Sequence, residues 1–405
     1  MIKLGQIRQV RKQQLRIRLT FVFLILIPLL WVSAIWCVYL YMFTAENYPA
    51  KARIDLEKVD WSTVVTYQDL DILPQQVSNY PLAGYELVDQ ELPAFASVDA
   101  GQSLLTFSPG KYDVGAYRIV LKPIASEGLA TTRVSLELQV KLADIDWDKL
   151  QADLLNVMGD QQSHYGIYIK DLLRGDELKY QSDLIFPPGS ISKLPTAVIL
   201  LRDVDAGKID LDKDTYPVTN ALKHGTADLI AQYPQGTLLP IRTYLEQLLL
   251  FSSNTAHYHL RTMLGGNYEV LSPRMLSELG VDHLSEDPHE AQPEDVGRVF
   301  VEIYERRALS DASRDYFFYL LKNAAPSLKQ AIPAGVPSGT QVANKVGFLF
   351  GGREGDIYND SGVVFGNNTD YVLVVLNNSA PPFPQGSEMI KRISQVVYAA
   401  LDAND

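Results

Sequence analysis

The chain has 405 residues, which is too long for one ordinary hydrophobic core and predicts two or more domains. Hydrophobic residues make up 47% of the sequence and charged residues 21%, values that exclude a wholly disordered chain. The formal net charge is −12, but six basic and no acidic residues precede Phe43. The rest of the chain therefore carries a charge of −18, which would repel the phosphate backbone of a nucleic acid.

The first predicted element is an apolar, uncharged segment at residues 19–43, which follows a basic tail at residues 1–18. About 20 apolar helical residues cross a bilayer, so we predict a transmembrane helix there. Because basic flanks stay in the cytoplasm, we expect a single-pass cell membrane protein with its N-terminus inside and its C-terminal domains outside. A cleaved signal peptide is the alternative, although its apolar core usually has about 7–15 residues. The single cysteine, Cys37, lies in this segment and excludes a disulfide framework.

Residues 60–143 have the pattern of a small β-rich domain. Short runs of β-forming residues are separated by turn residues such as Pro109 and Gly110. The runs that predict strands are 103–107, 116–121 and 132–140. Several short strands over about 85 residues predict an immunoglobulin-like or cadherin-like sandwich. We interpret this domain as a stalk, with a ligand-binding or partner-binding module as the alternative.

Residues 147–405 predict a larger mixed domain that opens with a hairpin of strands at 166–170 and 178–180. Residues 194–201 are apolar at nearly every position, which predicts a helix that is buried on all sides and closed by Gly207. Further predicted elements of this domain are strands at 360–365 and 370–376 and a helix packed on the sheet at 387–401.

Ser190 and Lys193 stand at the start of the buried helix. Positions i and i+3 share one face of a helix, so the hydroxyl and the amine can meet. A serine hydroxyl is a weak nucleophile until a base removes its proton, and a desolvated lysine can be that base. The motif alone is weak evidence, because Ser190 could equally be a helix N-cap.

Two later segments add polar residues to this pattern. Ser252 and Asn254 follow an apolar helical run, and Lys345 and Gly347 are predicted on a strand. A glycine in such a strand lets a substrate approach the backbone closely.

In this order, S-x-x-K at 190–193, S-x-N at 252–254 and K-V-G at 345–347 resemble the signature of serine β-lactamases and penicillin-binding proteins. The flanking sequence at 186–195 looks like the class A family, and the resemblance covers about residues 150–402. It implies an α+β, serine β-lactamase-like fold. In that fold an antiparallel sheet packs with an all-helical lobe, and the active site lies in the cleft between them.

The resemblance implies catalytic roles for four residues. Ser190 would be the nucleophile that forms an acyl-enzyme, and Lys193 would accept or relay its proton. Ser252 would pass a proton toward the leaving nitrogen. Lys345 would supply positive charge near the substrate carboxylate and the Ser252 hydroxyl.

The resemblance also implies how substrate would be bound. Asn254 would bind the substrate amide, and Gly347 would allow close approach to the strand. The oxyanion would be held by the backbone N–H groups of Ser190 and Phe348.

The sequence departs from the family in two places. Val346 stands where the family usually has Thr or Ser, so we expect carboxylate binding to weaken by about 1–3 kcal/mol. The Glu-x-x-Leu-Asn loop, whose glutamate activates the deacylating water in class A enzymes, is missing between the second and third motifs. Glu286 or Glu290 could replace that glutamate, and a solvated loop carboxylate is the alternative for each.

Two functions follow from this pattern. The first is a membrane-anchored serine hydrolase of the class A type that forms an acyl-enzyme with β-lactams or D-Ala peptides and deacylates slowly. The alternative is a catalytically silent, β-lactamase-like binding or scaffold protein of the cell envelope. The expected partners are a β-lactam or peptidoglycan-like small substrate and the membrane. We expect no cofactor and no metal site, because His257 and His259 are two residues apart on a helix and face different directions.

Overall fold

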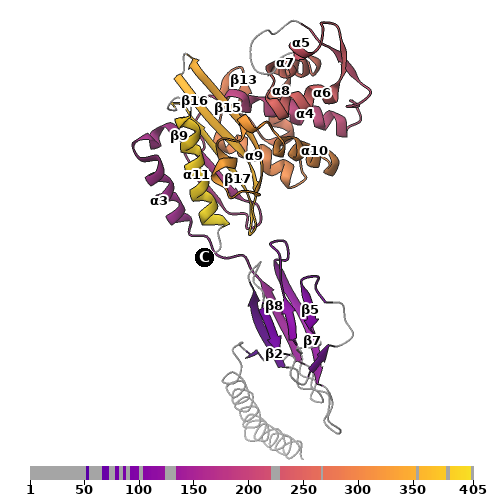
Figure 1. The fold of residues 1–405 in the computed structure, drawn as a ribbon, viewed down its shortest axis with the longest axis vertical. Helices are drawn as coiled ribbons and strands as arrows, with labels where there is room; N and C mark the ends of the chain where they lie inside the picture. The colour runs from indigo at the N-terminus through magenta and orange to yellow at the C-terminus, as the bar shows by residue number, and fades with distance from the viewer. Residues whose placement is uncertain are drawn as a thin grey trace, which may run out of the picture. The chain divides into compact units, whose positions relative to one another are not determined.

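The chain is represented by a computed structural model in which two compact units are distinct, Met1–Ala143 and Asp144–Asp405 (Figure 1). The structure describes residues 52–53, 66–72, 78–81, 85–87, 92–99, 104–123, 134–219, 229–265, 268–352, 355–379 and 384–402. The predicted basic tail and the predicted transmembrane helix at 19–43 lie outside these residues. Within them, none of the helices combines the length and the hydrophobicity needed to cross a membrane.

The regular elements described in the first unit are β-strands joined by turns and loops. One sheet has the order β1 (Ala52–Arg53), β2 (Thr66–Ile72), β8 (Val134–Val140), β7 (Gly115–Pro123) and β4 (Tyr85–Leu87). A second has the order β3 (Ser78–Pro81), β6 (Leu104–Phe107) and β5 (Ala96–Asp99). The strands predicted at 103–107, 116–121 and 132–140 are confirmed as β6, β7 and β8. The immunoglobulin-like sandwich stays a prediction.

The second unit is built around a five-stranded antiparallel sheet. Its order is β10 (Glu177–Tyr180), β9 (Tyr165–Asp171), β17 (Asp370–Asn377), β16 (Gly355–Phe365) and β15 (Gln341–Gly352). All eight residues of the central strand β17 are buried, as expected for a strand covered on both faces. All five strands that the sequence predicted in this unit, including the one that carries Lys345, are confirmed.

Different helices cover the two faces of this sheet (Figure 1). Because side chains alternate along a strand, residues of β17 from Tyr371 to Val375 at odd positions face one hydrophobic core. That core also holds side chains of α3 (Trp147–Met158) and α11 (Gln385–Leu401), two helices that pack together. The even positions of β17 face a second core, which is shared with the helical lobe. The predicted α+β arrangement of a sheet and a helical lobe is therefore confirmed.

The helical lobe surrounds α4, nine of whose twelve residues are buried, as the apolar run at 194–201 predicted. Its helices are α4 (Leu194–Asp205), α5 (Leu229–Gln232), α6 (Ile241–Phe251), α7 (Asn254–Met263), α8 (Tyr268–Leu279), α9 (Pro293–Tyr304) and α10 (Asp311–Lys322). The second unit also contains short strands and 3-10 helices between its longer elements. They are η3 (Gly159–His164), η4 (Gly189–Lys193), β11 (Thr215–Pro217), β12 (Leu238–Pro240), β13 (Leu284–Glu286), β14 (His289–Ala291), η5 (Pro326–Leu328) and η6 (Ile332–Gly335).

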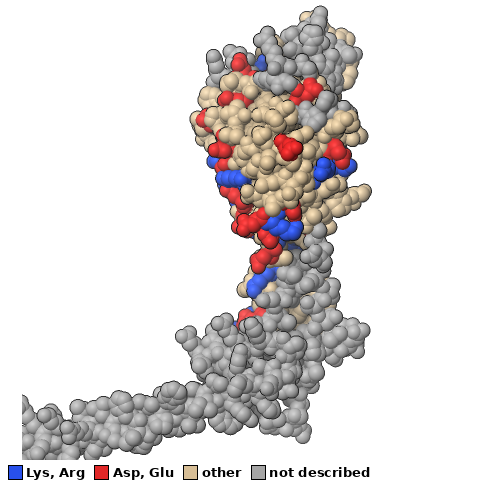
Figure 2. All heavy atoms as spheres, turned by 90° about the vertical axis from the view of Figure 1, so that its left-hand side faces the viewer, with Lys and Arg blue, Asp and Glu red and all other residues tan. Residues whose placement is uncertain are grey.

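Figure 2 shows acidic and basic side chains intermixed on one face of the chain. Most of the middle of that face is uncharged. The described basic residues on this face do not gather into the continuous positive patch that is typical of nucleic-acid-binding proteins.

Candidate active site

A β-bridge holds the chain in place just before Ser190. Phe186 forms a β-bridge with Ala291, with backbone hydrogen bonds of 2.9 and 2.8 Å. Gly189 has φ +55°, a left-handed conformation that favours glycine, and it begins η4. Residues i and i+3 eclipse in a 3-10 turn, so η4 directs Ser190 and Lys193 to the same side.

Ser252 and Asn254 lie at a sharp break between two helices. Ser252 ends α6 in the left-handed region at φ +58°, and Ser253 caps α7 by accepting a hydrogen bond of 3.1 Å from the backbone N–H of Ala256. This break turns the Ser252 and Asn254 side chains toward Lys193, as the contacts of that lysine show.

Lys193 is buried against this break. Its Nζ donates to Ser252 O at 2.6 Å, Ser252 Oγ at 3.2 Å and Asn254 Oδ1 at 2.5 Å. Burial lowers the pKa of Lys193 to about 8, and the Glu286 carboxylate opposes part of that fall. A substantial fraction of Lys193 is therefore neutral near pH 7 to 8 and able to accept a proton.

Lys345 reaches the same hydroxyl from the sheet. It lies on β15, its exposed fraction is 1%, and its Nζ donates to Ser252 Oγ at 2.9 Å and to Val346 O at 2.8 Å. Burial lowers the pKa of Lys345 well below its ordinary value, and the neighbouring charge of Lys193 lowers it further. A bound anion next to this amine would therefore favour its charged form.

The structure thus brings three of the four predicted catalytic side chains into direct contact, with Ser252 Oγ between the two lysines. The hydrogen bonds of the two amines go to Ser252, Asn254 and Val346 rather than to the Ser190 hydroxyl. Catalytic hydrogen bonds are often long in unliganded enzymes and tighten only with substrate. Ser190 is half-buried and lines the same cavity as Lys193, Ser252 and Asn254.

Two glycines let β15 lie directly against the turn that carries the nucleophile. A Cβ on Gly347 would lie 2.2 Å from Pro188 O and 3.0 Å from the backbone nitrogen of Ser190. A Cβ on Gly189 would lie 2.9 Å from the backbone nitrogen of Phe348. The backbones of Ser190 and Phe348 therefore lie side by side, the arrangement that an oxyanion hole made of two N–H groups requires.

The cavity over Ser190 has a volume of about 480 Å³. Its lining residues are Gly189, Ser190, Ser192, Lys193, Ser252, Asn254, His257, Tyr258, Arg261, Glu286, His289, Leu328, Phe348 and Leu349. No group of three or more potential metal ligands occurs among the residues that the structure describes.

Sequence reasoning missed the part of this lining that α7 provides. His257, Tyr258 and Arg261 follow Asn254 at spacings of three, four and seven residues, so they share one helix face with it. That periodicity was readable in the sequence and could have identified them. Burial lowers the pKa of His257 well below its ordinary value, with further lowering by Lys193 and Arg261, so its imidazole is neutral.

The β13–β14 hairpin distinguishes the two candidate glutamates. Glu286 pairs with His289 and Ser285 pairs with Glu290, and paired residues of an antiparallel ladder project to the same face. Glu286 and His289 line the cavity. Glu290 projects to the other face, where its carboxylate lies 3.3 Å from His283 Nδ1. Glu286 is therefore the candidate that reaches the site.

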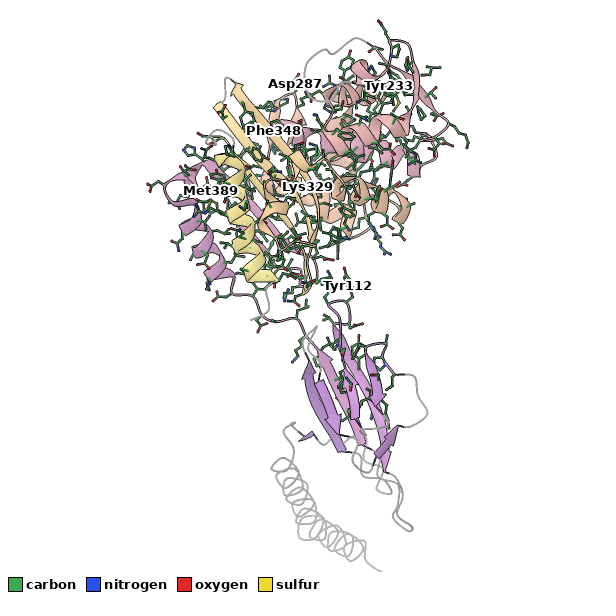
Figure 3. The ribbon with its side chains drawn as sticks, in the orientation of Figure 1. Tyr112, Tyr233, Asp287, Lys329, Phe348 and Met389 are labelled. Carbon is green, nitrogen blue, oxygen red and sulfur yellow. The ribbon has the colours of Figure 1, made fainter. Side chains whose placement is uncertain are left out.

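Val346 does not line the cavity. Because residues alternate along β15, its side chain points away from Lys345 and Gly347, and it is buried in the core beneath α11 with an exposed fraction of 1%. The ring of Phe348, two residues further along β15, packs against the same core and stacks on Tyr358 and Phe350 at 6.0 and 5.5 Å. Figure 3 labels Phe348 on β15 and Asp287 at the turn of the β13–β14 hairpin, and both elements contribute residues to the cavity lining.

Comparison with known proteins agrees with this geometry. Residues 149–401 match the model of the "Beta-lactamase enzyme family". The chain is similar to the β-lactamase VEB-1 of Pseudomonas aeruginosa, with 22% identity over 229 residues that cover 53% of this chain and 76% of that protein.

Solved structures with the same fold include PBP-A, with a TM-score of 0.57 at 24% identity over 64% of this chain and 98% of that one. A β-lactamase from Chitinophaga pinensis gives 0.56 at 23% identity over 62% and 98%. The TLA-1 extended-spectrum β-lactamase gives 0.58 at 21% identity over 63% and 99%. The sequence match, the shared fold and the three motifs around one cavity establish that the chain belongs to the β-lactamase enzyme family of serine hydrolases.

Proposed function

We propose that the chain is a class A-type serine hydrolase whose Ser190 forms an acyl-enzyme with β-lactams or with peptides ending in D-Ala. The observation that carries this proposal is the meeting of Lys193 and Lys345 at Ser252 Oγ, in the cavity that Ser190 lines. A related structure, of a PBP-A variant, is described as an acyl-enzyme complex with penicillin G. That protein supports a β-lactam as the substrate class for this one.

Acylation would begin at Lys193. With a pKa of about 8 it is partly neutral near neutral pH, so it can take the proton of the Ser190 hydroxyl as that oxygen attacks the carbonyl carbon. The carbonyl oxygen becomes an oxyanion, which the adjacent backbone N–H groups of Ser190 and Phe348 would stabilise. Removing one donor from such a pair typically slows a reaction by about 10²–10³-fold.

The leaving nitrogen needs a proton, and Ser252 can deliver it. Its Oγ accepts hydrogen bonds from both lysine Nζ atoms, so a proton given to the nitrogen can be replaced from Lys193. Lys345 would attract the substrate carboxylate, and the bound anion would favour its charged form.

Asn254 is suited to orient the substrate. Its Oδ1 accepts from Lys193, which leaves its amide N–H₂ to donate toward a carbonyl of the substrate. The side chain is thereby held in one orientation before substrate binds, which lowers the entropic cost of positioning.

The same proposal includes location. A helix at residues 19–43 would anchor the chain in the cell membrane with its N-terminus in the cytoplasm, and the β-rich unit would act as a spacer that holds the catalytic unit outside. The apolar segment and its basic flank support this assignment. Accessibility of the catalytic unit to protease added to intact cells would test it.

A catalytically silent scaffold is the less favoured alternative. It was motivated by Val346 and by the missing loop glutamate. The Val346 side chain lies outside the cavity, and the polar residues of all three motifs line it or contact one another there. An envelope phenotype that is lost on deletion of the chain but retained with Ser190→Ala would favour the scaffold.

Covalent labelling tests the proposed function. The full-length chain should be labelled by a fluorescent penicillin, and Ser190→Ala should abolish the label. Hydrolysis of nitrocefin then separates turnover from simple trapping, and release of D-Ala from peptides separates the two substrate classes. If high concentrations and long incubation give no label, and no D-Ala is released, the enzymatic proposal is wrong.

A further inference from the structure

The turn just before the nucleophile has few backbone donors of its own. Phe186 is bonded through its backbone to Ala291, and Gly189 begins η4. Pro187 and Pro188 lie between them. A proline has no backbone N–H, so neither residue can tie this turn to its neighbours by donating a hydrogen bond. The position of the turn must therefore be set through its carbonyl groups and through packing.

A buried asparagine of the sheet binds the first of these carbonyls. Asn359 lies on β16 and is fully buried, and its Nδ2 donates to Pro187 O at 2.7 Å. Because side chains alternate along a strand, Asn359 shares with Val363 the face of β16 that packs against the helical lobe. The hydrogen bond therefore runs from the sheet to the residue three positions before Ser190.

The amide of Asn359 is also held at its oxygen. Its Oδ1 accepts a hydrogen bond of 2.8 Å from the backbone N–H of Asn377 on β17. Exchanging the amide oxygen and nitrogen would face donor with donor and acceptor with acceptor, so both partners fix one orientation of the side chain. Asn359 is thus a rigid link between the central strand of the sheet and the turn before Ser190.

The next carbonyl of the turn lies against the neighbouring strand. Asn359 pairs with Gly347 of β15, and a Cβ on Gly347 would lie 2.2 Å from Pro188 O. Two adjacent strands therefore contact successive carbonyls, since β16 binds Pro187 O and β15 packs against Pro188 O. This spacing decides whether the N–H of Ser190 and the second oxyanion donor, on β15, reach the same oxygen, because such donors act at about 2.7–3.1 Å.

A second buried asparagine shows what a role confined to the sheet looks like. Asn377 is also fully buried, its Nδ2 donates to Tyr358 O and its Oδ1 accepts from Tyr358 N at 3.4 Å. Both bonds join β17 to β16 beyond Val375, the last residue of β17 in the paired register of the two strands. Asn359 and Asn377 therefore match in residue type, burial and location, and they differ in the hydrogen bond of Asn359 to Pro187.

We propose that Asn359 is a positioning residue of the acylation step, which holds Pro187 O so that the Ser190 N–H and hydroxyl stay aligned with the N–H of Phe348. The proposal rests on the proposed function, because it requires acylation at Ser190. Asn359 acts through the backbone of the turn, and its effect should appear in the rate of the chemical step.

The test uses rapid-quench mass spectrometry of the full-length chain mixed with benzylpenicillin over a range of concentrations. Asn359→Ala should lower the maximum acylation rate by about 10²-fold, the effect that a displacement of about 1 Å can have. The half-saturating concentration should stay close to the wild-type value, because the side chains that bind substrate are retained. Asn377→Ala should lower the Tm by a similar amount and acylate at nearly the wild-type rate. A wild-type rate in Asn359→Ala, or equal rate losses in the two variants, would overturn the proposal.

Asn359→Asp separates positioning from general destabilisation. A protonated carboxyl can donate to Pro187 O and accept from the Asn377 N–H as the amide does, whereas a carboxylate can only accept and repels the carbonyl oxygen. The ratio of variant to wild-type acylation rates should therefore rise as the pH is lowered from about 8 to about 5. The ratio for Asn359→Ala should stay constant. A constant ratio for Asn359→Asp would contradict the proposal.

Failure of this inference and failure of the proposed function give different results. If benzylpenicillin does not acylate the wild type at any concentration, the proposed function fails and the role of Asn359 fails with it. If the wild type is acylated and Asn359→Ala is acylated equally fast, the role of Asn359 alone is wrong.

Discussion

Replacing Gly347 by alanine should separate the two oxyanion donors without removing any polar group. The new Cβ would lie 2.2 Å from Pro188 O and 3.0 Å from the backbone nitrogen of Ser190. Ordinary van der Waals contact requires about 3.4 Å or more, so β15 and the turn before Ser190 must move apart by about 1 Å. The N–H groups of Ser190 and Phe348 would then no longer reach one oxygen together.

The magnitude follows from the geometry of such donors. They act at about 2.7–3.1 Å, so a shift of about 1 Å removes most of the contribution of one of them, which is worth about 10²–10³-fold in rate. Overpacking of this kind also destabilises the fold by about 1–3 kcal/mol. Acylation and stability must therefore be measured separately.

Gly362→Ala provides the matched control. Its Cβ would lie 2.2 Å from Ala343 O, an equal overlap within the same sheet, but its nearest contacts belong to β15 rather than to the turn before Ser190. Thermal unfolding should report similar losses for both variants, while rapid-quench acylation by benzylpenicillin should fall only for Gly347→Ala. Equal acylation rates in the two variants would refute the assignment of the oxyanion hole.

Three further outcomes are expected from the titratable groups. Lys193 must be neutral to accept a proton, and its pKa is about 8. The acylation rate should therefore rise by about tenfold per pH unit below pH 8 and level off above it. An acylation rate that stopped-flow measurements find independent of pH would contradict this role. Lys329 (labelled in Figure 3) donates to Leu321 O, Val342 O and Asn344 Oδ1. Lys329→Met should therefore lower the free energy of unfolding, measured in urea, by about 3 kcal/mol. A loss below about 1 kcal/mol would contradict this expectation. Burial raises the pKa of Asp360 from 3.8 to about 6, so the native state binds this proton more tightly than the unfolded state does. The free energy of unfolding should therefore fall on the order of 2–3 kcal/mol as the pH rises from about 4 to about 6. Asp360→Asn should abolish that fall, and an unchanged pH dependence of unfolding would exclude Asp360 as its source.

The sequence was sufficient to predict that Lys193, Ser252 and Lys345 come together. Residues 190 and 193 share a face on any helical turn, and Lys345 lies on a strand whose next residues form a hairpin. Local periodicity therefore predicted the elements, and the resemblance of the three motifs to serine β-lactamases implied the sheet and the helical lobe. The individual elements depend on spacing along the chain, which a sequence contains directly.

The features that were not predicted depend on register and on backbone conformation. Glu286 and Glu290 could not be distinguished until the pairing of Glu286 with His289 was known, because a shift of one residue exchanges the two faces of a hairpin. The left-handed conformation of Ser252 has no signal in its residue type. The burial of Val346, however, could have been predicted from the sequence. On a strand that points Lys345 toward the site, the neighbouring residue must point away from it.

The central claim is that Ser190 becomes covalently acylated in this cavity. The most direct measurement is intact mass spectrometry of the full-length chain mixed with benzylpenicillin, followed by peptide mapping of the adduct. We predict one penicilloyl group per chain, located on the peptide that contains Ser190 and absent from Ser190→Ala. A chain that stays unmodified at long times, or an adduct that maps to another residue, would contradict the account.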